Sequence, residues 1–115
     1  MKYENYLVLS RFKGEVIYRL ARGYKLEEDS RLAYCKFVDP DSQNYAIIDV
    51  ATGLFIVKST SKKKVFEKWN KASSDTEFIK SIMKARYTKT YLIRVEQLTA
   101  EKRIWRESGY LIEGK

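Results

Sequence analysis

The side chains that carry most enzyme chemistry are scarce in this chain of 115 residues. It has no histidine, which excludes His-based general acid and base catalysis, the serine and cysteine triads and the His-containing zinc motifs. Its one cysteine, Cys35, lies among apolar residues, and we expect a small core side chain and not a nucleophile. The Ser-x-x-Lys pattern of a Ser/Lys hydrolase starts at Ser10, Ser59, Ser61 and Ser81, and four copies in so lysine-rich a chain indicate chance.

Acidic side chains offer no better candidate for catalysis or metal binding. Asp39 and Asp41 flank a proline, but the glycine and the distal glutamate of a calcium loop are missing, so residues 39–44 are expected to form a turn. The Pro-Asp pair could also begin a metal-dependent nuclease motif, but its acidic-x-Lys partner occurs only at 113–115, too far away to complete it. The chain has neither a P-loop nor a dinucleotide fingerprint. We therefore expect no enzymatic activity, no cofactor and no metal site.

The strongest chemical signal is a run of cations in the second half of the chain. Residues 1–57 hold eight Lys or Arg and eight Asp or Glu, whereas residues 58–115 hold fifteen and seven, so all of the net charge of +8 lies in the second part. This asymmetry favours nucleic acid, a ribonucleoprotein or an acidic protein surface as the partner, and the plain alternative is a solubilising surface. The candidate partner-binding residues are Lys58, Lys62, Lys63, Lys64, Lys68, Lys71, Lys80, Lys84, Arg86 and Lys89.

Three hydroxyl residues, Ser59, Thr60 and Ser61, precede the densest part of this run. Their side chains can cap a helix that begins with three lysines, although the positive end of the helix dipole disfavours cations there. A bound anion would offset this cost, because free backbone N–H groups and lysines would both contact it. We therefore predict an anion-binding helix start at these three residues.

The elements expected to position the cations begin with a β-hairpin. Residues 45–50 and 54–58 are short apolar runs joined by a turn that contains Gly53, which predicts two antiparallel strands. Both arms are apolar at nearly every position, which indicates that both faces are covered and that the hairpin is central in its sheet. A basic helix at 61–71 follows, with Val65 and Trp69 on its apolar face.

Two further helices are predicted after this unit. The Ser-x-x-Glu pattern at 74–77 is a capping box in front of a helix at 75–86. Residues 88–98 alternate as a strand would, although their apolar residues also suit a helix. Thr99 can cap a closing helix at 100–107.

The first 38 residues are expected to add strands, so we predict one α+β domain over residues 1–115. Residues 6–12 suit a strand or a short helix, 16–21 a returning strand and 32–38 a further strand. The expected architecture is an antiparallel sheet built on the central hairpin and packed by two or three helices. No apolar run is long enough to span a bilayer and no signal peptide is evident, so we expect a cytoplasmic protein of a bacterial host.

The order of features between Tyr45 and Trp69 resembles a module of small proteins from bacterial phages and mobile elements, some of them anti-CRISPR proteins. The features are a hydrophobic strand, Asp49, Thr52-Gly53, a second hydrophobic strand, Thr60, Lys63 and a helix that ends in Trp69. The resemblance implies a small α+β protein without catalysis, which blocks a CRISPR effector nuclease at its guide-RNA, target-DNA or protospacer-adjacent-motif surface. Many such inhibitors are acidic mimics of DNA. Since this chain is basic, it would instead grip guide RNA, DNA or an acidic patch of the nuclease.

These observations lead to three hypotheses of different classes. The first is a non-enzymatic phage or mobile-element protein whose basic second half engages nucleic acid or a nucleoprotein, including inhibition of a CRISPR effector. The second is a small DNA-binding transcriptional regulator that uses the helices at 61–71 and 75–86. The third is a protein that binds only other proteins and has no affinity for nucleic acid.

Overall fold

The computed structural model describes residues 2–38 and 44–109. Within these residues, five strands precede three helices. The strands are β1 (Glu4–Phe12), β2 (Glu15–Lys25), β3 (Leu32–Phe37), β4 (Tyr45–Asp49) and β5 (Phe55–Ser59). The helices are α1 (Lys62–Ser73), α2 (Thr76–Ala85) and α3 (Lys89–Glu107). The predicted α+β class is confirmed, and the predicted turn at 39–44 falls almost wholly outside the described residues.

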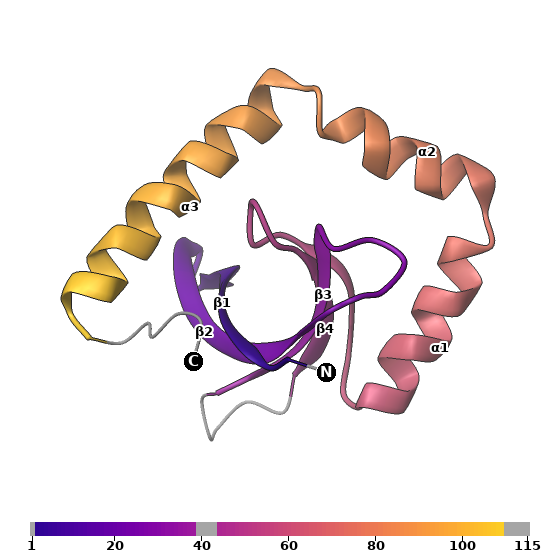
Figure 1. Cartoon of the computed structure of the whole chain (residues 1–115), viewed down its shortest axis with the longest axis horizontal. Coiled ribbons are helices and arrows are strands. Elements are labelled where there is room, and N and C mark those ends of the chain that lie inside the picture. The colour runs from indigo at the N-terminus through magenta and orange to yellow at the C-terminus, as the bar shows by residue number, and fades with distance from the viewer. Residues whose placement is uncertain (1, 39–43, 110–115) are drawn as a thin grey trace.

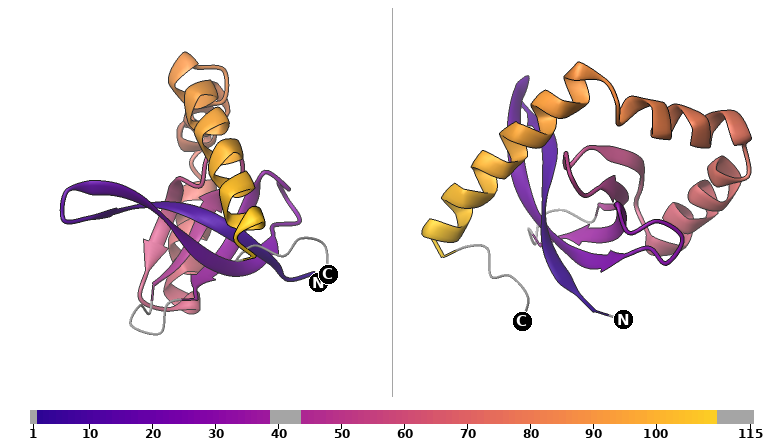
Figure 2. Two further views of the ribbon diagram at one scale, coloured as in Figure 1. Left: turned by 90° about the vertical axis from the view of Figure 1, so that its left-hand side faces the viewer. Right: turned by 45° about the horizontal axis from the view of Figure 1, so that its top comes forward.

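The described strands form one antiparallel meander in the order β1-β2-β3-β4-β5. The predicted hairpin is present as β4 and β5, but it lies at one end of the sheet and not at its centre. The sheet curls (Figure 1), and the turn after β4 returns to β1, where the Leu9 N–H donates to the Gly53 carbonyl oxygen at 2.8 Å. β1 and β5 are thus the two edges of an open barrel, from which the β1–β2 hairpin projects as a twisted ribbon (Figure 2).

Two glycines permit this curvature, because a side chain has no room at either position. A Cβ atom at Gly23 of β2 would lie 1.8 Å from the Tyr34 carbonyl oxygen of β3. Gly53 has a φ of +75°, and a Cβ atom there would lie 2.6 Å from the Leu7 carbonyl oxygen of β1. The turn can approach β1 only because glycine tolerates this backbone angle and has no side chain.

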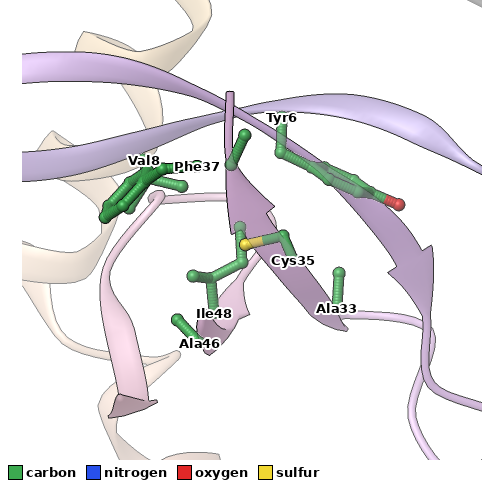
Figure 3. Close-up of a cluster of buried hydrophobic side chains, with 8 residues drawn as sticks. Tyr6, Val8, Ala33, Cys35, Phe37, Ala46 and Ile48 are labelled. Atoms are coloured by element: carbon green, nitrogen blue, oxygen red, sulfur yellow. The ribbon is translucent and has the colours of Figure 1, made fainter. Parts of the chain in front are cut away.

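The inner face of the curled sheet is a small apolar core. Alternate residues of β1, β3 and β4 point into it, as the period of two of a β-strand requires. Figure 3 shows Cys35 and Ile48 among the side chains of this cluster. Its buried members are Tyr6, Val8, Ala21, Ala33, Cys35, Phe37, Ala46 and Ile48. Burial raises the pKa of the Cys35 thiol to about 12, so this side chain is a neutral core residue, as the sequence predicted.

The three helices form an arc around the outer face of the sheet (Figure 1). Val65 and Trp69 of α1 are buried against the outer side chains of the sheet, which include Ile47 of β4. Leu98 of α3 is also buried, with 1% of its surface exposed. Of the described helices, none has the length and the apolar character that a bilayer span requires.

The helix starts follow capping rules, with one shift along the chain. Ser61 caps α1, as predicted, and its hydroxyl accepts a hydrogen bond from the Lys64 N–H at 3.2 Å. Asp75, and not Ser74, caps α2 and accepts from the Glu77 N–H at 2.9 Å. The predicted capping box is therefore wrong by one residue, because Ser74 is the C-cap of α1, which ends at Ser73. Asp and Ser are equally strong caps, so the local pattern alone did not separate them.

The last helix is much longer than the sequence predicted. It begins at Lys89, so residues 89–98 are helical and the strand favoured for 88–98 is wrong. Thr88 is its N-cap and accepts from the Tyr91 N–H at 3.1 Å. Thr99, predicted as the cap, lies inside the helix. The helical alternative prevails because the less exposed residues recur every three or four positions and so share the face that turns toward the sheet.

The carboxylate of Asp49 ties the β4–β5 turn to α3. One carboxylate oxygen accepts from the Thr52 hydroxyl at 2.6 Å and from the Thr52 N–H at 3.2 Å. The other accepts from the Tyr91 hydroxyl at 3.0 Å. Because Asp49 is only 4% exposed, these donors replace the water that its carboxylate has lost.

The Tyr91→Phe variant is expected to lower the free energy of unfolding by about 1–2 kcal/mol, because the buried Asp49 carboxylate loses a donor. Burial and the hydrogen bond to Asp49 raise the pKa of Tyr91 to about 12, so the hydroxyl is a donor across the neutral range. Urea unfolding measures the change, with Tyr87→Phe as the control, since Tyr87 is 86% exposed. Equal stability of the two variants would show that the hydrogen bond from Tyr91 to Asp49 does not stabilise the fold.

An ion pair joins the end of α2 to the connection between β2 and β3, and its titration is expected to be visible in the stability. Arg86 Nη2 lies 2.8 Å from Asp29 Oδ2. Burial alone would raise the pKa of Asp29, but hydrogen bonds from Arg86 and Arg31 and their charges lower it below 3.8. The pair therefore stabilises the fold above about pH 4 and less as the pH falls further.

The variant Asp29→Asn should unfold more easily than the wild-type protein at pH 7, and the difference should shrink as the pH falls below about 4. Urea unfolding at a series of pH values measures both curves. A difference of constant size down to the lowest pH would mean that the carboxylate charge of Asp29 does not stabilise the fold.

Candidate nucleic-acid interface

A cavity of about 400 Å³ opens next to the contact at which the sheet closes on itself. It lies between the two edge strands, and α3 contributes to its wall. The lining residues are Leu9, Ser10, Arg11, Val16, Arg19, Leu54, Phe55, Lys58 and Arg94. The cavity is thus lined by the β1–β2 hairpin, by β5 with the residue before it and by α3, which are far apart in the sequence.

Four of these described lining residues are cations and none is acidic. We refer to Arg11, Arg19, Lys58 and Arg94 as the basic seam. Positive charges around one concavity repel one another, and apolar walls such as Phe55 strengthen the local positive potential. An anion in the cavity would relieve the repulsion, so the arrangement suits the phosphate groups of a nucleic acid.

Two seam cations lie over aromatic rings. The Cζ atom of Arg19 is 3.9 Å from the ring centroid of Phe37, and the Nζ atom of Lys58 is 5.0 Å from the ring centroid of Phe55. Cation–π contacts of this kind hold a charged head group in place. The seam is therefore partly ordered before an anion binds, which lowers the entropy cost of binding.

The lysines of α1 extend this positive surface across the edge strand. Lys68 Nζ donates a hydrogen bond to the carbonyl oxygen of Lys58 at 2.9 Å, which brings α1 to the seam. Lys64 and Lys71 are exposed and lie four residues before and three residues after Lys68, so the three share one helix face. We refer to Lys64, Lys68 and Lys71 as the lysine stripe, which thus adjoins Lys58 of the cavity lining.

The start of α1 has a different environment. Lys62 Nζ lies 5.4 and 5.2 Å from the ring centroids of Tyr24 and Tyr34, so this side chain covers aromatic surface, while Lys63 is exposed. The first turn of α1 carries no acidic residue, and the hydroxyl of Ser61 is engaged in the cap. The anion site predicted at this helix start stays a prediction.

The other predicted contacts do not reach the seam. Arg86 is paired with Asp29 and its side chain is 8% exposed, so it is a structural residue and not a surface cation. Lys80 forms an exposed ion pair at 3.8 Å with the residue three positions earlier, and such pairs have little net effect on stability. Lys84 and Lys89 are exposed on α2 and at the start of α3.

Three of the four seam cations, Arg11, Arg19 and Arg94, were not among the residues predicted from sequence. The first two lie in the half of the chain whose charges sum to zero, so the charge asymmetry did not indicate them. Arg94 lies in the segment 88–98, for which a strand was favoured over a helix. Only the curl of the sheet and the true extent of α3 bring these residues to Lys58.

Comparisons of the chain with protein-family models, with curated proteins and with solved structures found no match. No relative therefore assigns a function to the fold. The chemistry of the basic seam and of the lysine stripe must indicate the class of partner instead.

Proposed function

We propose that this chain is a non-enzymatic binding protein of a phage or mobile element that engages nucleic acid or a nucleoprotein through its basic surface. The observation that carries the proposal is the basic seam, a cavity whose described lining has four cations and no acid. The lysine stripe of α1 lengthens this surface, and the net charge of +8 adds a long-range attraction to polyanions.

The mode of binding follows from the kind of groups that the surface presents. Arginine and lysine heads bind phosphate oxygens, which position a protein on a nucleic acid but carry no sequence information. Each neutralised phosphate releases counterions, so affinity falls linearly on a log–log plot against salt. The proposal therefore predicts binding with weak sequence preference and a steep salt dependence.

The resemblance of residues 45–69 to modules of anti-CRISPR proteins supports a more specific form of the proposal. In this form the target is a CRISPR effector ribonucleoprotein, and the basic seam contacts its guide RNA, the DNA or an acidic patch. The expected result is that the wild-type protein inhibits DNA cleavage by a sensitive effector, while a variant without seam charges does not.

The proposal is tested by fluorescence anisotropy with labelled duplex DNA, single-stranded DNA and single-stranded RNA of unrelated sequences. We expect binding at about 50 mM salt that weakens steeply toward about 200 mM, with a log–log slope of about −3 or steeper. Selective binding of one short operator would favour the transcriptional regulator instead. No binding to any of the three at low salt would contradict direct nucleic-acid binding and leave a protein or an assembled ribonucleoprotein as the partner.

A further inference from the structure

The cavity of the basic seam is lined by apolar side chains as well as by cations. Its apolar lining residues are Leu9, Val16, Leu54 and Phe55. Val16 is 47% exposed and Leu54 is 37% exposed, although both are large apolar side chains. A phosphate group gains nothing from contact with apolar surface, so phosphate binding accounts for the cations but not for this part of the lining.

The volume of the cavity also exceeds what a phosphate group requires. It is about 400 Å³, which falls within the range of sites that hold whole organic molecules. In a nucleic acid, the group that the sugar carries beside each phosphate is a base, which has a planar and largely apolar face. A nucleotide therefore suits both the size and the mixed lining of the cavity.

Planar side chains at the cavity suit an unpaired base. Phe55 lines the cavity, and so does Arg19, whose Cζ atom lies 3.9 Å from the ring centroid of Phe37. Unpaired bases stack on aromatic rings and on guanidinium planes. A positively charged groove that also offers such planes has the usual composition of a site for single-stranded nucleic acid.

Only a single strand can use the apolar lining at little cost. In a duplex each base is paired and stacked, and turning one out of the helix costs the energy of that pairing and stacking. A duplex therefore presents only its phosphates to the seam, whereas a single strand presents its phosphates and a free base.

We propose that the basic seam prefers single-stranded nucleic acid, because one unpaired base enters the cavity and contacts Leu54 and Phe55 while the adjacent phosphates contact the seam cations. This inference rests on the proposed function and narrows its ligand. Duplexes bind the seam through phosphates alone, and so less tightly once salt screens the charges. The apolar contact accepts any base, since every base has a planar face, and the sequence preference therefore stays weak.

The test is fluorescence anisotropy with three labelled probes of equal length. They are a single DNA strand of mixed sequence, the duplex of that strand, and a strand of tetrahydrofuran abasic residues, which keeps every phosphate but has no base. At about 200 mM salt, the intact strand is expected to bind at least about tenfold more tightly than the abasic strand, and more tightly than the duplex. The log–log salt slopes of the intact and abasic strands should agree, because both present the same phosphates.

Two matched leucine variants locate the base contact. Leu54 lines the cavity, whereas Leu92 is 55% exposed on α3 and is not among the described lining residues. Leu54→Asn makes the lining polar without changing any charge. It is expected to weaken binding of the intact strand about threefold or more and to leave binding of the abasic strand within about 1.5-fold. Leu92→Asn should leave binding of both strands within about 1.5-fold.

Three results would overturn the base contact and leave the proposed function standing. They are equal affinities for the intact and the abasic strand, binding of the duplex as tight as that of the single strand at about 200 mM salt, and equal effects of Leu54→Asn and Leu92→Asn on the intact strand. No binding of any probe at low salt would overturn both the base contact and direct nucleic-acid binding.

Discussion

Replacing Lys58 and Arg94 together by glutamine is expected to weaken binding to duplex DNA by about tenfold or more at moderate salt. Both residues line the basic seam, from β5 and from α3. Each lost phosphate contact lowers the log–log salt slope by about 0.9, so the slope should fall by about 2. The loss should be nearly equal for DNA of different sequences, because phosphate contacts do not distinguish bases. Anisotropy titrations at several salt concentrations measure both quantities.

The matched control is the double variant Lys84→Gln and Lys89→Gln, which removes the same charge from exposed positions away from the seam. It lowers the general positive potential equally but removes no seam contact, so we expect a clearly smaller change in slope and affinity. Equal losses for the two double variants would show that binding follows net charge alone. The basic seam would then not be the DNA-binding site.

The second large effect is expected from Gly23→Ala, which should destabilise the fold by about 3 kcal/mol or more. A Cβ atom at this position would lie 1.8 Å from the backbone oxygen of Tyr34, and backbone cannot move aside as a flexible side chain can. Relief requires β2 and β3 to separate, which would also open the curl that brings β1 to β5. Urea unfolding measures the stability, and loss of nucleic-acid binding should accompany it.

The matched control for this substitution is Gly14→Ala. Gly14 has a φ of +81°, but no atom lies within 4 Å of a Cβ atom placed there. The cost should therefore be limited to the backbone strain of a left-handed residue, about 1 kcal/mol. Equal stability of the two variants would contradict the close packing of β2 on β3 at Gly23.

The parts of the fold that could be predicted from the sequence are those with strong local signals. The hairpin at β4 and β5 and the helices α1 and α2 follow from apolar runs, a turn glycine and capping residues, and all of them form. The first three strands were also anticipated, although a short helix was an open alternative for 6–12. Their pairing order required long-range contacts that no local pattern encodes.

The segment at 88–98 shows where local patterns are ambiguous. Its apolar residues fit both a period of two and a period near 3.6, and the strand was favoured. The structure is helical because Thr88 supplies the cap and Tyr91 reaches Asp49 from the helix face turned to the sheet. Tertiary contacts decided between two periodicities that the sequence allowed.

The candidate site was only partly predictable, because charge in a sequence does not tell where a side chain lies. Lys58 and Lys68 were both predicted as partner-binding residues, and the structure places them next to each other. Arg86 was counted as a surface cation, yet it is enclosed with Asp29, an acid far away in the chain. Arg19 also belongs to the basic seam, but it lies in the first half of the chain, whose charges sum to zero and so did not indicate a basic site.

The measurement that tests the central claim most directly is an NMR map of the DNA-binding surface. The ¹⁵N-labelled protein is titrated with a short duplex at low salt, and the titration is repeated at high salt. We predict that the largest amide shifts cluster at residues 9–11, 16–19, 54–58 and 94, with smaller ones along Lys64 to Lys71, and that high salt abolishes them. Shifts centred on residues 76–89, or none at all at low salt, would contradict the assignment of the basic seam as the nucleic-acid interface.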